Sequence, residues 1–311
     1  MRVVAALGGN ALSPTGGTGS VEEMRVALAA TGKALAGLVA SGVSLVLTHG
    51  NGPQVGRILL QQELAASTVP PMPMDVCGAE SQGQLGYLIA QALDNALRAR
   101  QLESRILCLV TQVVVAGRDP AFRRPSKPVG PAYDRPTAQR IAHESGHVFA
   151  IQPGGRWRRV VASPKPVRLV EEASLRALAD AGHVVVAAGG GGVPVVEHRG
   201  RLRGVEAVVD KDRTAALLAR AVGADRLLIL TEVAKVQVGF GTPAARSLDE
   251  LSVTEARRLL AAGEFPAGSM GPKVEACADF VAGGGTGAVI AALSDAAAAA
   301  RGEAGTAVVP G

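Results

Sequence analysis

The sequence predicts an α/β fold in which a mainly parallel sheet lies between layers of helices. Short apolar runs alternate with longer amphipathic stretches, which is the pattern of βαβ units. Three of the apolar runs lead directly into glycine turns, as strands do where the loops of a parallel sheet meet at one edge. The 311 residues are 48% apolar and only 3% aromatic, so small aliphatic side chains must build the core. These observations predict a three-layer αβα sandwich.

The predicted elements follow this pattern along the chain. Buried strands are expected at Val3–Leu7, Val43–Leu47, Ile106–Val115, Val184–Ala188, Leu227–Leu230 and Ala288–Ala292. Helices are expected at Val21–Ala40, after Pro53, at Arg213–Ala221 and at Ala296–Ala300. Ser20 and Glu23 have the spacing of a capping box, and Ser252 and Glu255 repeat it, so a helix should begin at each serine.

Composition argues against several classes of protein. The net charge is +5 and the pI about 9.4, but few aromatic side chains exist for stacking on bases, which argues against nucleic-acid binding. No apolar run is long enough to cross a membrane, and the first strand reaches glycine too early for a signal peptide. The cysteines, Cys77, Cys108 and Cys277, have neither disulfide nor zinc spacing. We therefore expect a cytoplasmic protein in a reducing compartment.

A proline- and arginine-rich segment, Arg118–Val167, interrupts the α/β pattern. Such a segment cannot be a simple crossover connection between two parallel strands, because proline interrupts helices and removes backbone hydrogen bonds from β-sheets. We interpret it as a lid or a small protruding subdomain, whose basic character suits a negative ligand. A solvated surface excursion is the alternative. Lys127 favours the lid, because it lies in a turn stiffened by Pro125 and Pro128.

Three glycine turns, Leu7–Asn10, Thr48–Pro53 and Ala188–Pro194, follow predicted strands. Glycine lets a backbone approach an anion closely, so three such loops at one edge favour phosphate binding. Tight strand-to-helix packing is the alternative for any one of them. The chain lacks the P-loop pattern and the dinucleotide-binding fingerprint. We interpret His49 as a structural hydrogen-bonding residue, because phosphoryl transfer to a carboxylate or carbamate oxygen requires no base.

Lysines are the remaining candidates for chemistry, because phosphoryl transfer depends on positioning and fixed positive charge. Lys127 lies in the predicted lid, Lys211 lies between two carboxylates, and Lys273 follows a glycine-rich turn. Taken singly, each is more often a solvated surface residue. Asp212 has two possible roles that are compatible: an N-cap for the helix Arg213–Ala221, or a catalytic residue.

Together, these motifs make the sequence resemble the carbamate kinases of the amino acid kinase family. The similarity runs nearly end to end and includes the distinctive segment Trp157–Pro166. The segments that carry it are Ala6–Leu12, Thr48–Gly56, Met74–Ala79, Asp119–Phe122, Pro125–Pro131, Trp157–Pro166, Gly189–Pro194, Gly204–Asp212 and Gly268–Ala276.

The resemblance implies an open, mainly parallel eight-stranded sheet in a single domain spanning residues 1–311. It also implies an acceptor lobe over about residues 1–205, with a protruding subdomain near 118–167, and a nucleotide lobe over about 206–311. Carried across by motif, the residues that would hold carbamate and the moving phosphoryl group are Gly8, Gly9, Asn10, Gly50, Asn51 and Gly52, with Gly189, Gly190 and Gly191 as further phosphate-binding candidates. The catalytic residues would be Lys127, Lys211, Asp212 and Lys273. The nucleotide would contact Lys211, Thr231, Glu232, Val233, Met270, Gly271 and Lys273.

The implied activity is reversible transfer of a phosphoryl group between carbamoyl phosphate plus ADP and carbamate plus ATP, by direct in-line displacement. The resemblance also implies Mg²⁺ accompanying the nucleotide, a homodimer and a role in arginine metabolism, and it assigns no metal-ligating residue. Two alternatives remain open. One is a related kinase acting on another small acid, and the other is a catalytically silent nucleotide-binding regulatory module.

Overall fold

The computed structural model describes residues 1–13, 16–103, 105–266 and 268–311, and of Asn10 it describes only the backbone. Its centre is an eight-stranded sheet in which all neighbouring strands run parallel except β16 and β17. In spatial order the strands are β15 (Glu250–Ser252), β17 (Thr306–Val309), β16 (Gly287–Ala292), β12 (Arg226–Thr231), β1 (Arg2–Leu7), β2 (Ser44–His49), β9 (Val184–Ala187) and β3 (Ile106–Leu109). The mainly parallel eight-stranded sheet confirms the prediction.

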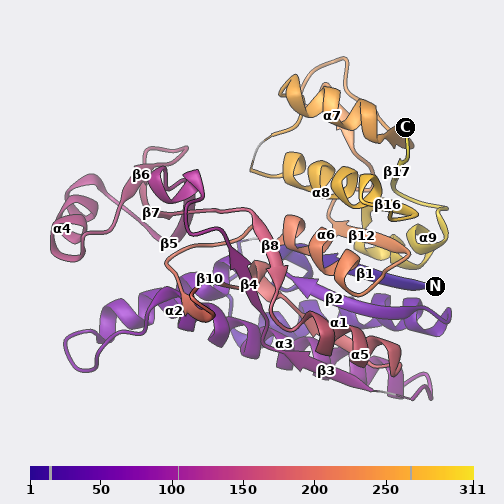
Figure 1. Ribbon diagram of the computed structural model, residues 1–311, viewed down its shortest axis with the longest axis horizontal. Coiled ribbons are helices and arrows are strands. Elements are labelled where there is room, and N and C mark those ends of the chain that lie inside the picture. Colours follow the sequence, from indigo (N-terminus) through magenta and orange to yellow (C-terminus); the bar gives the residue numbers. More distant parts are fainter. Residues whose placement is uncertain (14–15, 104, 267) are drawn as a thin grey trace.

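Helices cover both faces of this sheet (Figure 1). Alternate residues of each strand point to opposite faces, so Val4 and Ala6 of β1 join one core and Val3 and Ala5 join the other. On one side the sheet packs against α5 (Glu172–Asp180), α6 (Lys211–Ala221), α7 (Val253–Ala261) and α8 (Met270–Ala282). On the other it packs against α1 (Val21–Ala40), α3 (Met74–Arg98) and α9 (Ala296–Arg301).

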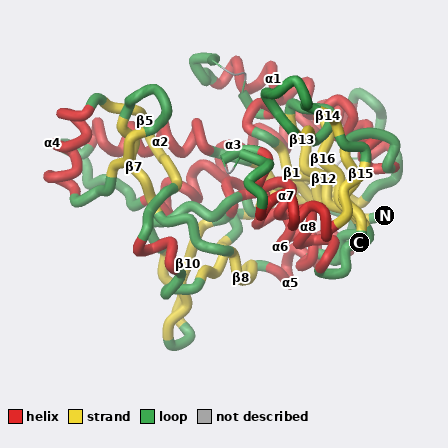
Figure 2. Tube along the Cα trace, turned by 90° about the horizontal axis from the view of Figure 1, so that it is seen from above, coloured by secondary structure: helices red, strands yellow, loops and turns green. Residues whose placement is uncertain are grey.

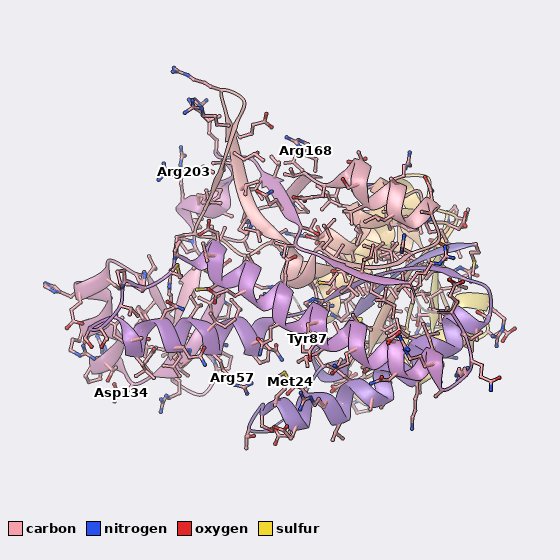
Figure 3. All side chains as sticks on the ribbon, turned by 90° about the horizontal axis from the view of Figure 1, so that it is seen from below. Met24, Arg57, Tyr87, Asp134, Arg168 and Arg203 are labelled. Atoms are coloured by element: carbon pink, nitrogen blue, oxygen red, sulfur yellow. The ribbon has the colours of Figure 1, made fainter. Side chains whose placement is uncertain are left out.

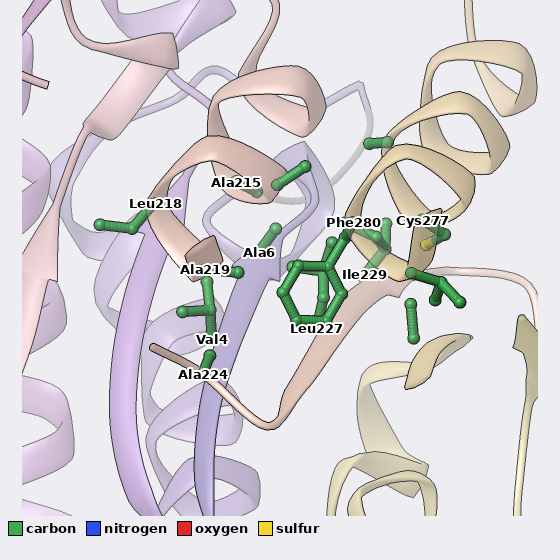
Figure 4. Close-up of a cluster of buried hydrophobic side chains, with 14 of the residues drawn as sticks. Val4, Ala6, Ala215, Leu218, Ala219, Ala224, Leu227, Ile229, Cys277 and Phe280 are labelled. Carbon is green, nitrogen blue, oxygen red and sulfur yellow. The ribbon is translucent and has the colours of Figure 1, made fainter. Parts of the chain in front are cut away.

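Small side chains fill the core that positions α6 and α8. Ala215 and Ala219 of α6 face Ala6 of β1, while Phe280 of α8 fills the space beside Leu227 (Figure 4). Alanine on both surfaces lets helix and sheet approach closely, which explains how a chain with few aromatics builds a continuous core. None of the helices in the described ranges is long and apolar enough to cross a membrane.

The segment that breaks the α/β pattern forms a unit that protrudes from the sandwich (Figures 1 and 2). It contains a three-stranded antiparallel sheet in the order β5 (Lys127–Tyr133), β7 (Trp157–Val161) and β6 (Phe149–Ile151), together with α4 (Arg135–Ser145). The long helix α2 (Gly52–Ala65) packs beside it. A four-stranded sheet has the order β11 (Arg201–Gly204), β10 (Val193–His198), β4 (Gln112–Val115) and β8 (Pro166–Leu169). A two-stranded sheet pairs β13 (Gln237–Val238) with β14 (Arg246–Ser247).

Helix α1 begins at the predicted capping box, in which Ser20 and Glu23 bond reciprocally. The single strand predicted over Ile106–Val115 is wrong. It divides into β3, at the edge of the large sheet, and β4, in the four-stranded sheet. Gln82 of α3 separates them, because its side-chain oxygen accepts the Thr111 N–H at 2.9 Å and its side-chain nitrogen donates to the Thr111 carbonyl at 3.1 Å. The Gln82 side chain thus takes the Thr111 N–H and shares the Thr111 carbonyl with the Val193 N–H at 2.9 Å, which an apolar pattern cannot reveal.

Candidate active site

The glycine turns lie together because β1, β2 and β9 are neighbours in the sheet and end at the same edge. The first turn forms a short 3₁₀ helix over Gly9–Ala11, and its Gly8 N–H bonds to the Leu230 carbonyl of β12 at 2.9 Å. The second turn leads into α2, and its Gly50 lies in contact range of the Lys211 side chain. Loops from three strands therefore surround one space at the sheet edge, as parallel strands require.

The third turn is packed without spare room. A Cβ on Gly189 would lie 2.3 Å from the His49 ring, and one on Gly191 would lie 2.1 Å from the Val209 carbonyl oxygen. Gly190 has φ +67° and lies against the side chain of Asn51, which donates to Ser81 at 2.7 Å. Glycine is required here for close approach and for the left-handed backbone. The packing interpretation of this turn is confirmed, and phosphate binding by it stays a prediction.

His49 is buried, and its neighbours fix its protonation state. The Gly50 carbonyl can only accept, so Nδ1 donates to it at 2.9 Å. Burial, together with the nearby charge of Lys211, lowers the pKa of His49 to about 4 in spite of that hydrogen bond. The imidazole is therefore neutral near pH 7, which agrees with a structural role.

A buried carboxylate joins two of the predicted lysines. Asp212, in the first turn of α6, accepts from Lys211 Nζ at 2.8 Å and from Lys273 Nζ of α8 at 2.9 Å. Its side chain is 4% exposed, and those of the lysines are 17% and 15% exposed. Burial alone would raise the pKa of Asp212, but the two ammonium groups outweigh it and hold that pKa below the usual value. The cluster is therefore charged, with one excess positive charge.

The capping role proposed for Asp212 is wrong. Helix α6 begins at Lys211, and Asp210 is its N-cap, accepting from the backbone N–H groups of Asp212 and Arg213. The other oxygen of Asp210 accepts from Lys127 Nζ of β5 at 3.0 Å. Asp210 thus links the protruding unit to the start of the helix that carries the lysine cluster, and Asp212 is left free to orient lysines.

Three cavities surround these residues. The glycine-loop cavity, about 610 Å³, contains Gly9, Gly50, Asn51, Gly52, Lys127, Gly190, Asp210, Lys211, Asp212 and Lys273 in its walls. The α8 cavity, about 510 Å³, is lined by Thr231, Glu232, Val233, Phe265, Met270 and Lys273, among others. A linking cavity of about 680 Å³ touches Gly8, Gly9, Lys211, Thr231, Glu232 and Lys273. Lys273 lines all three, so its ammonium group lies where the cavities meet.

The structure brings most of the predicted site residues into these walls. Gly189, Gly191 and Gly271 are buried behind them and line none of the three cavities. The side chain of Asn10 lies outside the described part of the structure. A cavity beside three lysines, joined to a more apolar one at the start of α8, suits a small anion next to a flat, partly apolar ligand.

Comparison with known proteins shows which family has this architecture. The model of the amino acid kinase family matches residues 1–292. A carbamate kinase of Pyrococcus horikoshii is 48% identical over 311 residues, covering 99% of each chain. The chain belongs to the amino acid kinase family. This amino acid kinase also resembles carbamate kinase from Giardia lamblia bound to AMP-PNP, with TM-score 0.94, 38% identity and coverage of 100% and 98% of the two chains.

A second Giardia lamblia structure, of the enzyme thiocarbamoylated by disulfiram on a cysteine, matches with TM-score 0.92 and 38% identity, covering 100% and 99% of the chains. These matches confirm that this amino acid kinase is a phosphotransferase, and full-length similarity to carbamate kinases supports carbamate kinase function. The fold and activity expected from the sequence motifs are therefore confirmed.

Sequence reasoning missed three charged residues of the glycine-loop cavity: Arg57, Arg158 and Asp210. Arg158 lies inside the distinctive segment Trp157–Pro166, which signalled the family without indicating which side chains face the site. Asp210 was noted only as a neighbour of Lys211. No pattern in the sequence pointed to Arg57, because one arginine on an amphipathic helix is ordinarily a solvated residue.

Proposed function

We propose that this amino acid kinase transfers a phosphoryl group between carbamoyl phosphate and ADP in the space where the three cavities meet. The observation that carries the proposal is the Lys211–Asp212–Lys273 cluster, which faces the glycine-loop cavity and, through Lys273, the α8 cavity. Carbamoyl phosphate would occupy the first and the nucleotide the second. The moving group would then pass beside two ammonium groups.

Fixed charge explains how this arrangement would catalyse transfer. A phosphoryl group in transit spreads negative charge over its oxygens, and groups already oriented toward it stabilise that charge without reorganisation. Asp212 holds both lysines from opposite oxygens, so their positions are set before substrate arrives. Lys127 would release Asp210 and contact the anion from the protruding unit. No protein nucleophile is needed, since carbamate oxygen attacks the nucleotide's terminal phosphorus directly.

Mg²⁺ is part of the proposal, bound with the nucleotide. No group of three or more acidic, histidine or cysteine side chains suited to a metal is found among the described residues. This fits an ion that takes most of its ligands from phosphates and water. Asp210, which lines the cavity with an oxygen shared only with Lys127, is the carboxylate placed to approach such an ion. The bound ion would neutralise phosphate charge.

The test is ATP formation from ADP, Mg²⁺ and fresh carbamoyl phosphate by the purified protein. A Lys273→Ala variant controls for contaminating kinases, and a blank without enzyme controls for spontaneous breakdown. We expect rapid synthesis that the substitution abolishes. Absence of ATP formation despite measurable ADP binding would refute carbamate as the acceptor. A nucleotide-binding regulatory module would be the next hypothesis if no small acid served either.

We further propose a homodimer, a cytoplasmic location and a role in arginine metabolism. Strand β3 supports the dimer, because it is an edge strand that leaves Leu107 and the adjacent Val110 exposed. Tyr87 of the adjoining α3 is 56% exposed as well. Sedimentation of wild type and a Tyr87→Glu variant tests this, with a monomeric wild type as the contradicting result. The unpaired cysteines agree with a reducing compartment.

A further inference from the structure

The lysines alone do not account for the positive charge of the glycine-loop cavity. Its walls carry five cationic and two anionic side chains: Arg57, Lys127, Arg158, Lys211, Lys273, Asp210 and Asp212. Each lysine of this cavity forms an ion pair with a carboxylate, and Asp212 pairs with two of the three. Neither arginine forms an ion pair with any described residue. Of the three excess charges, two therefore belong to arginines.

A bulge in the protruding sheet orients Arg158. The pairing of β5 with β7 shifts register between Val129 and Ala132, and Gly130 in the bulge has φ +67°. Arg158 donates to the part-buried Gly130 carbonyl from Nε at 3.1 Å and Nη2 at 2.8 Å. Its Nη1 makes no hydrogen bond to a described residue. Burial lowers the pKa of Arg158 without changing its charge near neutrality. The backbone thus fixes the guanidinium but does not neutralise it.

Arg57, like Arg158, is held by backbone carbonyls and not by a carboxylate. On α2, it donates from Nη1 to the Gly19 carbonyl and from Nη2 to the Thr18 carbonyl, each at 2.8 Å, near the start of α1 (Figure 3). The preceding Gly56 packs against the Gly130 backbone, since a Cβ on Gly56 would lie in van der Waals contact with the Gly130 Cα at 3.6 Å. This contact places both arginines on the wall where α2 meets β5.

We propose that Arg158, assisted by Arg57, forms the subsite that receives the phosphate dianion of carbamoyl phosphate. The proposal rests on the carbamate kinase activity proposed above and adds a division of labour to it. A guanidinium bonds phosphate oxygens in a fixed planar geometry, and these two need not break an ion pair to do so. The unpaired arginines attract and seat the phosphate group of carbamoyl phosphate before transfer, and the paired lysines stabilise the same group as it moves toward ADP.

Arg158→Gln tests the subsite, because glutamine keeps much of the length and loses the charge. The matched control is Arg159→Gln on the same strand. Arg159 pairs with Glu206 and does not line the glycine-loop cavity. Loss of one charge-assisted contact raises the KM for carbamoyl phosphate by roughly ten- to a hundredfold, with the KM for ADP and kcat changing less than about threefold. Arg158→Lys should recover part of the loss, and Arg159→Gln should keep both KM values.

An unchanged KM for carbamoyl phosphate in Arg158→Gln would overturn the proposal, and so would equal rises in both KM values, which indicate a damaged protruding unit. Sulfate separates this proposal from the activity on which it rests. Sulfate should raise the Tm of wild type and Arg159→Gln more than that of Arg158→Gln. If wild type makes no ATP yet this difference appears, the proposed reaction fails and the anion subsite stands. Equal sulfate shifts in all three proteins would refute the subsite.

Discussion

Replacing Asp212 with asparagine should damage stability and catalysis together, because one carboxylate orients two buried lysines. The amide keeps the size of the side chain but leaves two ammonium groups, which had bonded it at 2.8 and 2.9 Å, facing each other without a negative charge between them. Breaking a buried ion pair from one side costs about 3–5 kcal/mol. Since both lysines are under a fifth exposed, we expect the free energy of unfolding to fall by about 3 kcal/mol.

The same substitution should lower kcat by about 10²- to 10³-fold, the usual cost of misplacing a group that stabilises transition-state charge. Urea unfolding and ATP synthesis from carbamoyl phosphate measure the two effects. Glu275→Gln is the matched control, because Glu275 of α8 also pairs with α6, through Arg213 at 2.9 Å, but lies outside the glycine-loop cavity. That pair, whose side chains are 29% and 30% exposed, should contribute at most about 1 kcal/mol. An Asp212→Asn protein with stability and kcat near those of the control would refute the reasoning.

Three further predictions concern the surroundings of the cluster. Gly190→Ala should lower the free energy of unfolding by about 1–2 kcal/mol and reduce kcat, since Gly190 has φ +67° and abuts Asn51. A variant whose free energy of unfolding, measured in urea, and kcat both equal those of wild type would contradict this. The pKa of His49 lies near 4 in the folded chain and about 6.5 when unfolded, so stability should fall as pH drops from 6.5 to 4; His49→Gln should flatten that slope. Burial raises the pKa of Cys77 to about 11 and also raises that of Cys277, so neither thiol forms the reactive thiolate readily. Disulfiram should therefore leave activity intact. Loss of activity together with adducts on Cys77 or Cys277, found by mass spectrometry, would disprove this.

The apolar runs predicted the central strands and the capping signals predicted helix starts, because periodicity and local hydrogen bonding are properties of short segments. The break between β3 and β4 could not be predicted in this way. It depends on Gln82, whose side chain reaches Thr111 from a distant helix. A single apolar run gives no sign that a side chain from another element will bond to the backbone between its two halves.

The site shows the same limit. Glycine turns and lysines were predictable because their chemistry is local and their strand-end positions converge in a parallel sheet. Arg158 and Asp210 were not predictable, because each contacts a distant segment: Arg158 bonds the bulge carbonyl of Gly130, and Asp210 bonds Lys127 of the protruding unit. Asp212 was correctly grouped with the lysines, but the capping role belongs to the residue two positions before it.

The most direct test of the central claim is the kcat/KM of the purified protein for ATP synthesis with carbamoyl phosphate, measured beside acetyl phosphate and larger acyl phosphates. These donors present the same phosphoryl group to the same lysines and differ only in the acid that departs. A carbamate kinase should use carbamoyl phosphate with the highest kcat/KM. A higher value for another acyl phosphate would contradict the account and assign the lysine cluster to a different small acid.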